Sequence, residues 1–418
     1  MIATKPHILI INFTFPPFAG VGGRRWAKFA KYLKKQEIPF HVIASQRLET
    51  ASNWTKDIES YKDSITYIKG SYPLILTSNP KTIWAKIKYR LAFMREKYLA
   101  QGNYYDISKY WEKELVPLVR KKLAEGVDTV IYSIPPFRGA YFLSKLRKDF
   151  PKVQFIADYR DPWTSNRTSF GFESLSQKNL KYEIDMEREV IHSFDKVMSV
   201  SKEINDYLSH THKAKKDKFY VLKNGFDVDD KVPSNNPAGK TSFAFIGTFY
   251  QKARHLFDEF TQAVSELETE HPEWFKKVAF NFYGHKPDYF NAGIENISSI
   301  HHHGLISLEE ASQQIANSRA CMLFLADDTN YSFSTKFYEY VSNEKPVLLF
   351  AKPGITSEFI IENAIGISLP PGKIKEQLEK VIPQAISNGL SFNTKFDTNP
   401  FEVNQLTKDL LKIISHEF

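Results

Sequence analysis

Short, continuously apolar runs alternate with helical patterns along the whole chain, and this alternation constrains the fold more than any other feature. In the first half the apolar runs lie at residues 7–13, 40–44, 129–133, 154–157, 196–200 and 219–222. Helical patterns between them lie at residues 23–35, 138–148, 179–192 and 202–208. Apolar runs without polar interruption are typical of strands that are buried on both faces. The pattern therefore predicts an α/β fold with parallel sheets.

The alternation restarts after a turn-rich segment at residues 232–240, with further apolar runs at 242–246, 278–283, 320–325 and 347–350. A chain of 418 residues is also too long for one ordinary core. We therefore expect two α/β domains, residues 1–235 and 236–402. We expect the last helix, within residues 403–418, to pack back on the first domain.

Composition excludes several classes of protein. The single cysteine, Cys321, rules out a disulfide framework and any metal site built on several cysteines. No apolar run approaches the roughly 20 residues that span a bilayer, and the start of the chain lacks the pattern of a signal peptide. We expect a cytoplasmic protein. The net charge of +8 favours anionic partners without choosing among nucleotides, lipid headgroups and nucleic acid.

The turn after the first strand, residues 15–25, contains Gly20, Gly22 and Gly23. Glycines between a strand end and a helix start let backbone amides approach an anion. A dinucleotide fingerprint would need a third glycine where Arg25 stands, so nicotinamide binding is disfavoured. The alternative is a tight turn that binds no ligand.

A charged cluster follows the fourth apolar run, where Asp158, Arg160 and Asp161 precede Trp163. Two carboxylates beside an arginine can supply a general base or stabilise a cationic transition state. The alternative is an aspartate–arginine pair that pins the loop, with Trp163 as packing.

In the second half, Ser334 or Thr335 is suited to cap a helix in which Lys336 occupies the first turn. A cation there opposes the helix dipole unless an anion is bound. Glu339 lies on the same helical face and could accept the hydroxyls of a ribose. The alternative is a Lys336–Glu339 pair on a solvated helix.

A glycine also ends the first strand of the second half, where Gly247 and Thr248 are followed by Lys252 and Arg254. The two cations could neutralise a diphosphate, or could be solvated surface groups.

Two other patterns are discounted. His301, His302 and His303 would point to opposite faces of a strand, which argues against a metal site. The acidic run from Asp227 to Asp230 is interpreted as a turn.

Residues 81–98 form an amphipathic pattern with apolar Trp84, Ile87, Leu91, Met94 and Tyr98. The cations around this stripe are Lys81, Lys86, Lys88, Arg90, Arg95 and Lys97, opposed by Glu96 alone. The pattern is typical of a helix on an anionic membrane surface. A helix packed on its own domain, with a solvated basic face, is the alternative.

Together these motifs resemble a retaining glycosyltransferase of family 4, on the two-domain GT-B architecture with two Rossmann-like domains facing across a cleft. The resemblance covers nearly the whole chain, in the order 15–23, 157–163, 200–201, 223–227, 246–250, 304–306, 335–340 and 345–346. Tyr331 stands where many members have a glutamate near the sugar, and Arg160 where a histidine is frequent.

The resemblance implies roles for the candidate residues. Glu339 would bind the ribose of a nucleotide-sugar donor, while Ser334, Thr335 and Lys336 would bind its phosphates. Gly247, Thr248, Lys252 and Arg254 would lie at the departing diphosphate, with Arg254 assisting catalysis. Gly304, Leu305 and Ile306 would meet the base. Gly22 and Gly23 would close on the phosphates, Asp158 and Asp161 would be catalytic, and Arg160 and Trp163 would line the acceptor side.

The implied function is retaining transfer of a sugar to a glycan, lipid-linked or protein-linked acceptor, in cell-surface polysaccharide or glycoconjugate biosynthesis. Because lysine and arginine neutralise the leaving group, we expect no metal and no other cofactor. The alternatives are a sugar-nucleotide epimerase or hydrolase of the same fold, or a non-catalytic nucleotide- or glycan-binding protein. A nucleic-acid partner is disfavoured because the basic residues lack interleaved stacking aromatics.

Overall fold

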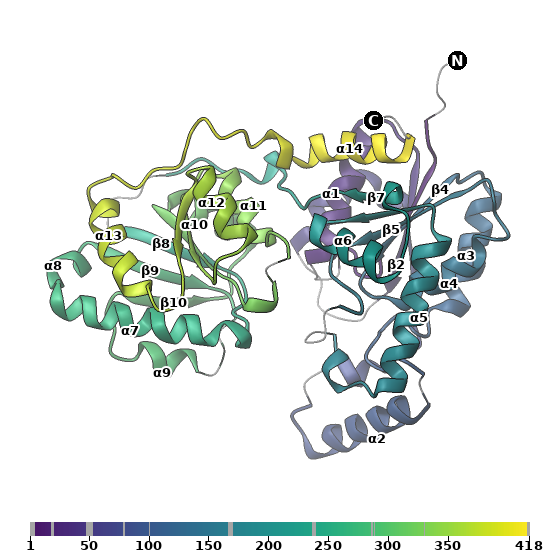
Figure 1. Ribbon diagram of the computed structural model, residues 1–418, viewed down its shortest axis with the longest axis horizontal. Coiled ribbons are helices and arrows are strands. Elements are labelled where there is room, and N and C mark those ends of the chain that lie inside the picture. The colour runs from purple at the N-terminus through teal and green to yellow at the C-terminus, as the bar shows by residue number, and fades with distance from the viewer. Residues whose placement is uncertain are drawn as a thin grey trace. The chain divides into compact units, whose positions relative to one another are not determined.

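The computed structural model describes residues 5–17, 21–46, 53–77, 80–99, 101–165, 170–235, 240–285, 287, 289–329 and 331–415 (Figure 1). The chain divides into two compact units, domain one (Met1–Lys223 with Thr407–Phe418) and domain two (Asn224–Leu406). Each domain is built around a parallel sheet, which confirms the predicted fold class. The turn-rich segment at 232–240 lies within domain two, and its residues 236–239 are outside the described residues.

Within the described residues, the sheet of domain one has the order β3-β2-β1-β4-β5-β6-β7, and all neighbouring strands are parallel. The strands are β1 (Ile8–Ile11), β2 (Phe40–Gln46), β3 (Ile65–Lys69), β4 (Thr129–Ile134), β5 (Gln154–Tyr159), β6 (Lys196–Ser199) and β7 (Phe219–Val221). The helices are α1 (Val21–Lys35), α2 (Ile83–Leu99), α3 (Glu112–Ala124), α4 (Arg138–Leu146), α5 (Gln177–Ser193) and α6 (Lys202–Thr211).

Strand order in domain one reverses between β1 and β4, because β2 and β3 extend to one side and β4 to β7 to the other. In open parallel sheets such a reversal opens a crevice at the carboxyl ends of the strands, where ligands bind. The predicted loops after β1 and β5 both lie at this edge.

Domain two has the order β10-β9-β8-β11-β12-β13 within the described residues, with the same reversal between β8 and β11. Its strands are β8 (Thr241–Ile246), β9 (Val278–Tyr283), β10 (Ile300–Gly304), β11 (Ala320–Phe324), β12 (Val347–Phe350) and β13 (Gly366–Leu369). Its helices are α7 (Arg254–Glu270), α8 (Pro272–Phe275), α9 (Phe290–Ile294), α10 (Leu308–Asn317), α11 (Thr335–Ser342), α12 (Ile355–Glu362) and α13 (Ile374–Ile386).

Phenylalanine rings fill the core of domain two between the sheet and α7. Phe243 stacks on Phe280 with ring centroids 5.0 Å apart, and Phe324 stacks on Phe350 at 4.2 Å. Phe260, from α7, contacts Phe280, Phe324 and Phe350 edge-on. These contacts hold α7 on the sheet and so fix where the carboxyl ends of β8 and β9 emerge.

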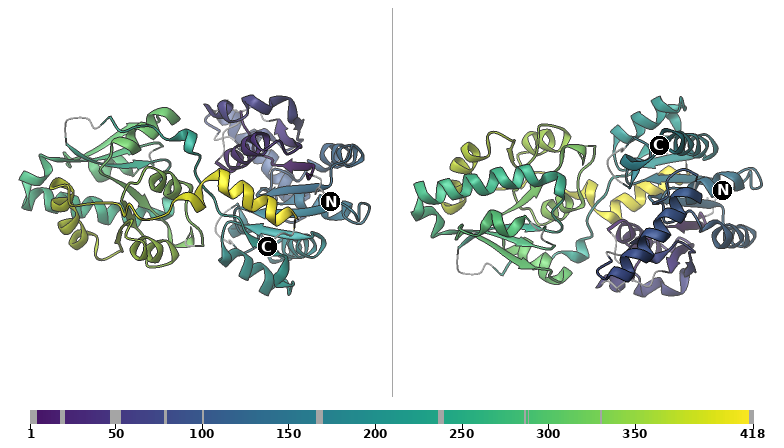
Figure 2. Two further views of the ribbon diagram at one scale, coloured as in Figure 1. Left: turned by 90° about the horizontal axis from the view of Figure 1, so that it is seen from above. Right: turned by 90° about the horizontal axis from the view of Figure 1, so that it is seen from below.

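The last helix, α14 (Val403–Ser415), ends in domain one (Figure 2). The ammonium of the buried Lys196 donates hydrogen bonds to the carbonyl oxygens of Ile413 and Ile414, the latter at 3.2 Å. Gln154 donates to the Ile414 carbonyl oxygen at 3.3 Å. Side chains from β5 and β6 therefore satisfy the carbonyl groups that are left open at the end of this helix.

In the ranges that the structure describes, no helix is long and apolar enough to cross a membrane.

Candidate functional site

Glycines with positive φ terminate three neighbouring strands of domain two. Gly247 follows β8, Gly284 follows β9 and Gly304 ends β10, with φ angles of 125°, 129° and 76°. The amide of Gly247 donates to the Tyr283 carbonyl oxygen at 2.8 Å, and that of Gly284 to the Gly304 carbonyl oxygen at 2.7 Å. A Cβ on Gly284 would overlap the backbone of Gly247. The strand ends thus present bare backbone, which a planar or phosphorylated ligand can approach closely.

Gly284 was not among the predicted site residues. Its signal is the one used for Gly247, a glycine directly after a continuous apolar strand, here residues 278–283. The predicted neighbours of Gly304 follow β10 as expected, where Leu305 is exposed and Ile306 is partly buried.

Lys336 joins the start of α11 to the end of β8. Its ammonium nitrogen lies 3.3 Å from the Thr248 carbonyl oxygen, to which it donates, and 4.4 Å from the centre of the Phe245 ring. A Cβ on Gly247 would overlap the Lys336 side chain. The structure therefore brings together Gly247, Thr248 and Lys336, which the sequence placed in separate motifs.

Ser334 caps α11, since its hydroxyl oxygen accepts a hydrogen bond from the Phe337 amide at 3.3 Å. This is one of the two predicted caps, and Thr335 is the first residue of the helix. Capping fixes where α11 begins and holds Lys336 in its first turn, at the positive end of the helix dipole.

Burial lowers the pKa of Lys336 to about 8, although the nearby charge of Glu339 acts in the opposite direction. A partly buried cation at a helix N-terminus is electrostatically unfavourable in the free protein. A bound anion would relieve both effects. Glu339, partly buried, lies in the next turn of the same helix.

Lys252 and Arg254 follow β8, in a 3-10 turn (Gln251–Ala253) and at the first position of α7. Both side chains are exposed. Arg254 pairs with Asp258 at 3.3 Å, and its guanidinium lies 4.9 Å from the centre of the Tyr289 ring. These contacts hold Arg254 beside the loop after β9, with part of its charge already matched by Asp258.

Asp158 proves to be a structural carboxylate in domain one. It is fully buried at the end of β5 and accepts hydrogen bonds from Trp26 Nε1 at 2.7 Å and Ser133 Oγ at 3.1 Å. It also pairs with the buried Arg25 at 3.4 Å. The prediction that Asp158 is catalytic is thus corrected in favour of the alternative, an aspartate–arginine pair, with Arg25 as the partner.

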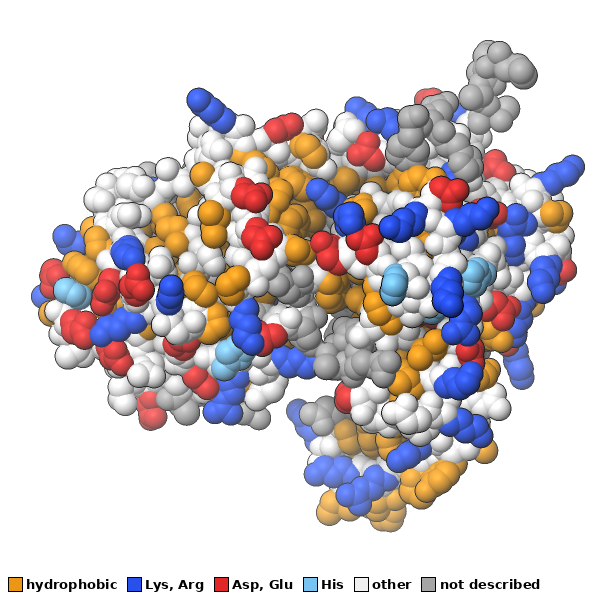
Figure 3. Space-filling model, viewed as in Figure 1, with side chains coloured by type: hydrophobic (Ala, Val, Ile, Leu, Met, Phe, Trp, Pro, Cys, Tyr) orange, Lys and Arg blue, Asp and Glu red, His pale blue; other side chains and the backbone are white. Residues whose placement is uncertain are grey.

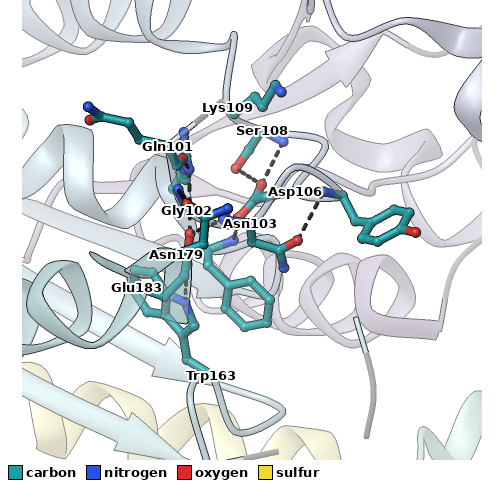
Figure 4. Close-up of polar contacts among 12 residues, drawn as sticks. Gln101, Gly102, Asn103, Asp106, Ser108, Lys109, Trp163, Asn179 and Glu183 are labelled. Atoms are coloured by element: carbon teal, nitrogen blue, oxygen red, sulfur yellow. Dashed lines mark hydrogen bonds and ion pairs between the residues drawn. The ribbon is translucent and has the colours of Figure 1, made fainter. Parts of the chain in front are cut away.

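The assignment of Trp163 to the acceptor side is also wrong. Trp163 is fully buried, donates from Nε1 to Glu183 at 2.8 Å and stacks on Phe137 with ring centroids 5.2 Å apart. Figure 4 shows Trp163 pointing toward Glu183. A side chain in this position packs the domain and cannot contact an acceptor.

Arg160 lies against the first turn of α1. Its Nε donates to Ser133 Oγ at 2.9 Å, and its guanidinium also bonds the Pro135 carbonyl oxygen. A Cβ on Gly22 would overlap this guanidinium, and one on Gly23 would overlap the backbone of Thr14. Burial lowers the pKa of Arg160, and the charges of Asp161 and Asp158 oppose that shift. The two predicted glycines are therefore needed for packing, whatever they bind.

Asp161 follows Arg160 and is partly buried at the carboxyl edge of the sheet. In the predicted turn after β1, residues 15–25, Phe18, Ala19 and Gly20 lie outside the described residues.

The histidines and the acidic run have structural partners. Nε2 of His302 donates to the Gly284 carbonyl oxygen at 3.0 Å, and His303 stacks on Tyr283. Asp227 caps a short turn by accepting from the Asp229 amide at 3.1 Å, which confirms the predicted turn. In the described part of the chain, no group of three or more histidine, cysteine or acidic residues is placed to hold a metal.

No protein-family model matches the sequence, and no curated protein matches it significantly. Solved structures do match the fold. Anabaena HepE, solved with UDP, has a TM-score of 0.64 at 14% identity, over 98% of this chain and 100% of that chain. WaaG, described as a glycosyltransferase of lipopolysaccharide biosynthesis, has a TM-score of 0.58 at 14% identity, over 98% and 99%.

A putative UDP-N-acetylglucosamine 2-epimerase from Listeria monocytogenes has a TM-score of 0.57 at 13% identity, over 99% of this chain and 97% of that chain. At such identities the likeness concerns the fold alone. The sheet order of both domains and these matches over whole chains establish that the protein has the GT-B fold, with two Rossmann-like domains.

Proposed function

We propose that the protein is a glycosyltransferase that uses a nucleotide-sugar donor bound by domain two. The observation that carries the proposal is the group formed by Lys336, Gly247 and Thr248 at the carboxyl edge of the sheet. It combines a cation with a lowered pKa, bare backbone and the N-terminus of α11, and each of these features favours a bound anion. HepE, which has the same fold, binds UDP.

The donor would lie along the three glycine-ended strands. Its diphosphate would meet Lys336 and the amides at the start of α11, where Ser334 and Thr335 stand, with Lys252 and Arg254 on the leaving side. Its ribose would meet Glu339, whose carboxylate lies one turn further along the helix. Its base would contact the backbone of Gly304 to Ile306, where a ring can lie flat on the exposed strand end.

In domain one we propose that Asp161 and Arg160 face the acceptor, with Gly22 and Gly23 near the transferred group. Transfer passes through an oxocarbenium-like state, which a carboxylate near the reacting carbon stabilises while cations stabilise the leaving diphosphate. We propose retention of configuration, as in family 4, with no metal or other cofactor, since Lys336 and Arg254 supply the positive charge. We propose a cytoplasmic role in cell-surface polysaccharide or glycoconjugate assembly.

A sugar-nucleotide epimerase is the second candidate, because the Listeria structure with the same fold is described as a putative enzyme of that kind. Such an enzyme would use the same donor site and need no acceptor. Product analysis distinguishes the two: a transferase consumes donor only slowly without acceptor, whereas an epimerase converts it, without acceptor, to an equilibrium mixture with its epimer.

The test of the donor site is thermal stabilisation by UDP, GDP, dTDP, CDP and ADP in the presence of a chelator. Binding to the folded state raises the melting temperature, by an amount that grows with the logarithm of ligand concentration over Kd once the ligand exceeds Kd. We expect one diphosphate to stabilise the protein, and the Lys336→Met variant to lose that shift. Lys352→Met is the matched control, because Lys352 is an exposed lysine of domain two that pairs with Asp327 at 2.6 Å. Equal shifts for both variants would place the site elsewhere.

A further inference from the structure

Helix α2 presents a stripe of large apolar side chains to solvent. Trp84, Leu91 and Tyr98 are 75%, 63% and 77% exposed, and Ile83, Ile87, Met94 and Leu99 are exposed as well. Figure 1 shows α2 at the lower end of domain one, and Figure 3 shows apolar and basic side chains gathered on that part of the surface. Single exposed apolar residues are ordinary, but a contiguous stripe marks an interaction surface.

Cations flank the stripe on both sides. At about 100° per residue, Trp84, Ile87, Leu91, Met94 and Tyr98 fall within about one third of the helix circumference. On the same helical wheel Lys88 and Arg95 border one edge, and Lys86, Arg90 and Lys97 border the other. All five are exposed, as is Lys81 before the helix, and none of the six forms an ion pair among the residues that the structure describes.

The opposite face of α2 is anchored to domain one. Phe93 contacts the rings of Tyr104 and Tyr105, with centroids 5.5 and 5.7 Å apart. Glu96, the one carboxylate of the helix, is buried, pairs with the buried Lys109 and accepts a hydrogen bond from the Tyr110 hydroxyl at 2.9 Å. The single negative charge of α2 is thereby neutralised inside the protein, and the outer face remains purely basic and apolar.

The segment that receives α2, residues 101–111, is itself fixed by buried polar contacts (Figure 4). The amide of Asn103 donates to Glu183 at 2.5 Å, and the amide of Gly102 donates to Asn179 at 3.2 Å. Asp106 accepts from the amides of Phe137 and Arg138, at 2.9 and 3.0 Å, and so caps α4. These contacts hold the segment beneath α2, and the helix presents its apolar stripe and flanking cations to solvent as one surface, which we call the platform.

We propose that this platform binds the surface of an anionic lipid bilayer, with α2 lying in the interfacial plane. The stripe of Trp84, Ile87, Leu91, Met94 and Tyr98 enters the region between headgroups and acyl chains, while the cations on both flanks bind lipid phosphates. Because cations lie along both edges of the apolar stripe, they can contact lipid phosphates on both sides of the helix when it lies flat on an anionic surface. A second copy of the chain is a poor occupant, because two such faces would oppose like charges.

The experiment is flotation of the whole protein with vesicles of phosphatidylglycerol and phosphatidylcholine, compared with phosphatidylcholine alone. We expect binding to the anionic vesicles that salt weakens, since each cation near the surface adds to the attraction. Lys88→Gln with Arg95→Gln should lower the partition coefficient about 30-fold, from two lost cations. Trp84→Ser with Leu91→Ser should abolish flotation.

Matched controls are Ile361→Ser, an apolar residue that is 61% exposed on α12, and Lys352→Gln, both in domain two. Neither should change flotation, and all variants should keep the melting temperature, because the substituted side chains are exposed. Failure to float with anionic vesicles, or flotation that the α2 variants leave intact, would overturn the proposal. Self-association that Trp84→Ser removes, without vesicle binding, would assign the stripe to a protein contact instead. None of these outcomes depends on whether the donor site binds a nucleotide.

Discussion

The ammonium nitrogen of Lys336 lies 3.3 Å from the carbonyl oxygen of Thr248, so one hydrogen bond ties the first turn of α11 to the end of β8. The bond to a neutral carbonyl leaves the positive charge without full compensation where burial already lowers its pKa. In the absence of an anion the site is therefore held under electrostatic strain, which a ligand of negative charge would remove.

The affinity for a nucleoside diphosphate should depend on pH through Lys336. Its pKa is about 8, so the side chain is charged at pH 7 and mostly neutral at pH 9. We expect the association constant to fall above pH 8, by up to about tenfold per pH unit, as the cation is lost. Titration calorimetry with UDP, or with the diphosphate found in the thermal screen, between pH 7 and 9 measures this slope. Lys352→Met should keep the slope and Lys336→Met should flatten it, so equal slopes would contradict the assignment.

Removing the charge of Lys336 should stabilise the free protein at neutral pH. The pKa is lowered from 10.5 in the unfolded chain to about 8 in the folded protein, so folding opposes protonation. The resulting penalty is fully present below pH 8 and is lost as the pH rises from 8 to 10.5. Lys336→Met should therefore melt at a higher temperature than the parent at pH 7, and the gain should disappear near pH 10.5. A gain that is independent of pH would indicate packing as its cause.

Substitution of Gly247 should disturb both the backbone and the cation. Its φ of 125° lies where side chains are strained, and a Cβ there would overlap Lys336. We expect Gly247→Ala to lose about 1–3 kcal/mol of stability and to weaken diphosphate binding. Gly126→Ala is the matched control, because its φ is 97°, no atom lies within 4 Å of the added Cβ, and it lies between α3 and β4 in domain one. Chemical denaturation and calorimetry compare the two, and equal losses of affinity would argue against a role for Lys336.

Glu339 should contribute to binding of the nucleoside and not of phosphate alone. We expect Glu339→Gln to weaken binding of a nucleoside diphosphate about tenfold, since a hydrogen bond to a charged group contributes roughly 1.5 kcal/mol or more. Affinity for inorganic pyrophosphate should be unchanged. Glu344→Gln, an exposed residue just after the same helix, is the control. An unchanged affinity for the nucleoside diphosphate would remove Glu339 from the site.

Asp158, near the end of β5, and Asp161, just after it, should differ in their roles, the first in stability and the second in catalysis. Asp158 is buried against Arg25 and Trp26, so Asp158→Asn should cost about 3 kcal/mol of stability by leaving a buried cation unmatched. Asp161→Asn should lower turnover, with little change in donor affinity or melting temperature. Turnover assays and melting curves on both variants test this division. A strong loss of stability in Asp161→Asn would make it a structural residue too.

The strands that could be predicted from the sequence have neighbours on both sides, except for the edge strand β7 (Phe219–Val221). Three strands were not predicted, β3, β10 and β13, and each lies at an edge of its sheet. Edge strands need no continuous apolar run: β10 reads Ile-His-His-His-Gly, and within it only Ile300 is buried. Edge segments contain polar residues because part of their surface is exposed. A prediction based on continuous apolar runs therefore does not detect them.

Local motifs predicted the cap Ser334 and the glycine after β8, because the chemistry of a helix start or a strand end depends on adjacent residues. The same reasoning failed for Asp158 and Trp163, whose positions are set by partners far away in the chain. Asp158 is satisfied by Trp26 and Ser133, and Trp163 by Glu183. Burial of a polar side chain depends on such distant partners, which a linear motif does not contain.

The return of α14 to domain one makes that domain discontinuous in sequence, with domain two inserted between its two parts. During synthesis on the ribosome, Lys196 emerges long before the carbonyl groups of Ile413 and Ile414 that satisfy its ammonium. Domain two is contiguous, so its chain is complete as soon as Leu406 has emerged, whereas domain one is complete only after the last helix has been made. The domain whose synthesis begins first is therefore the last to have its whole chain available.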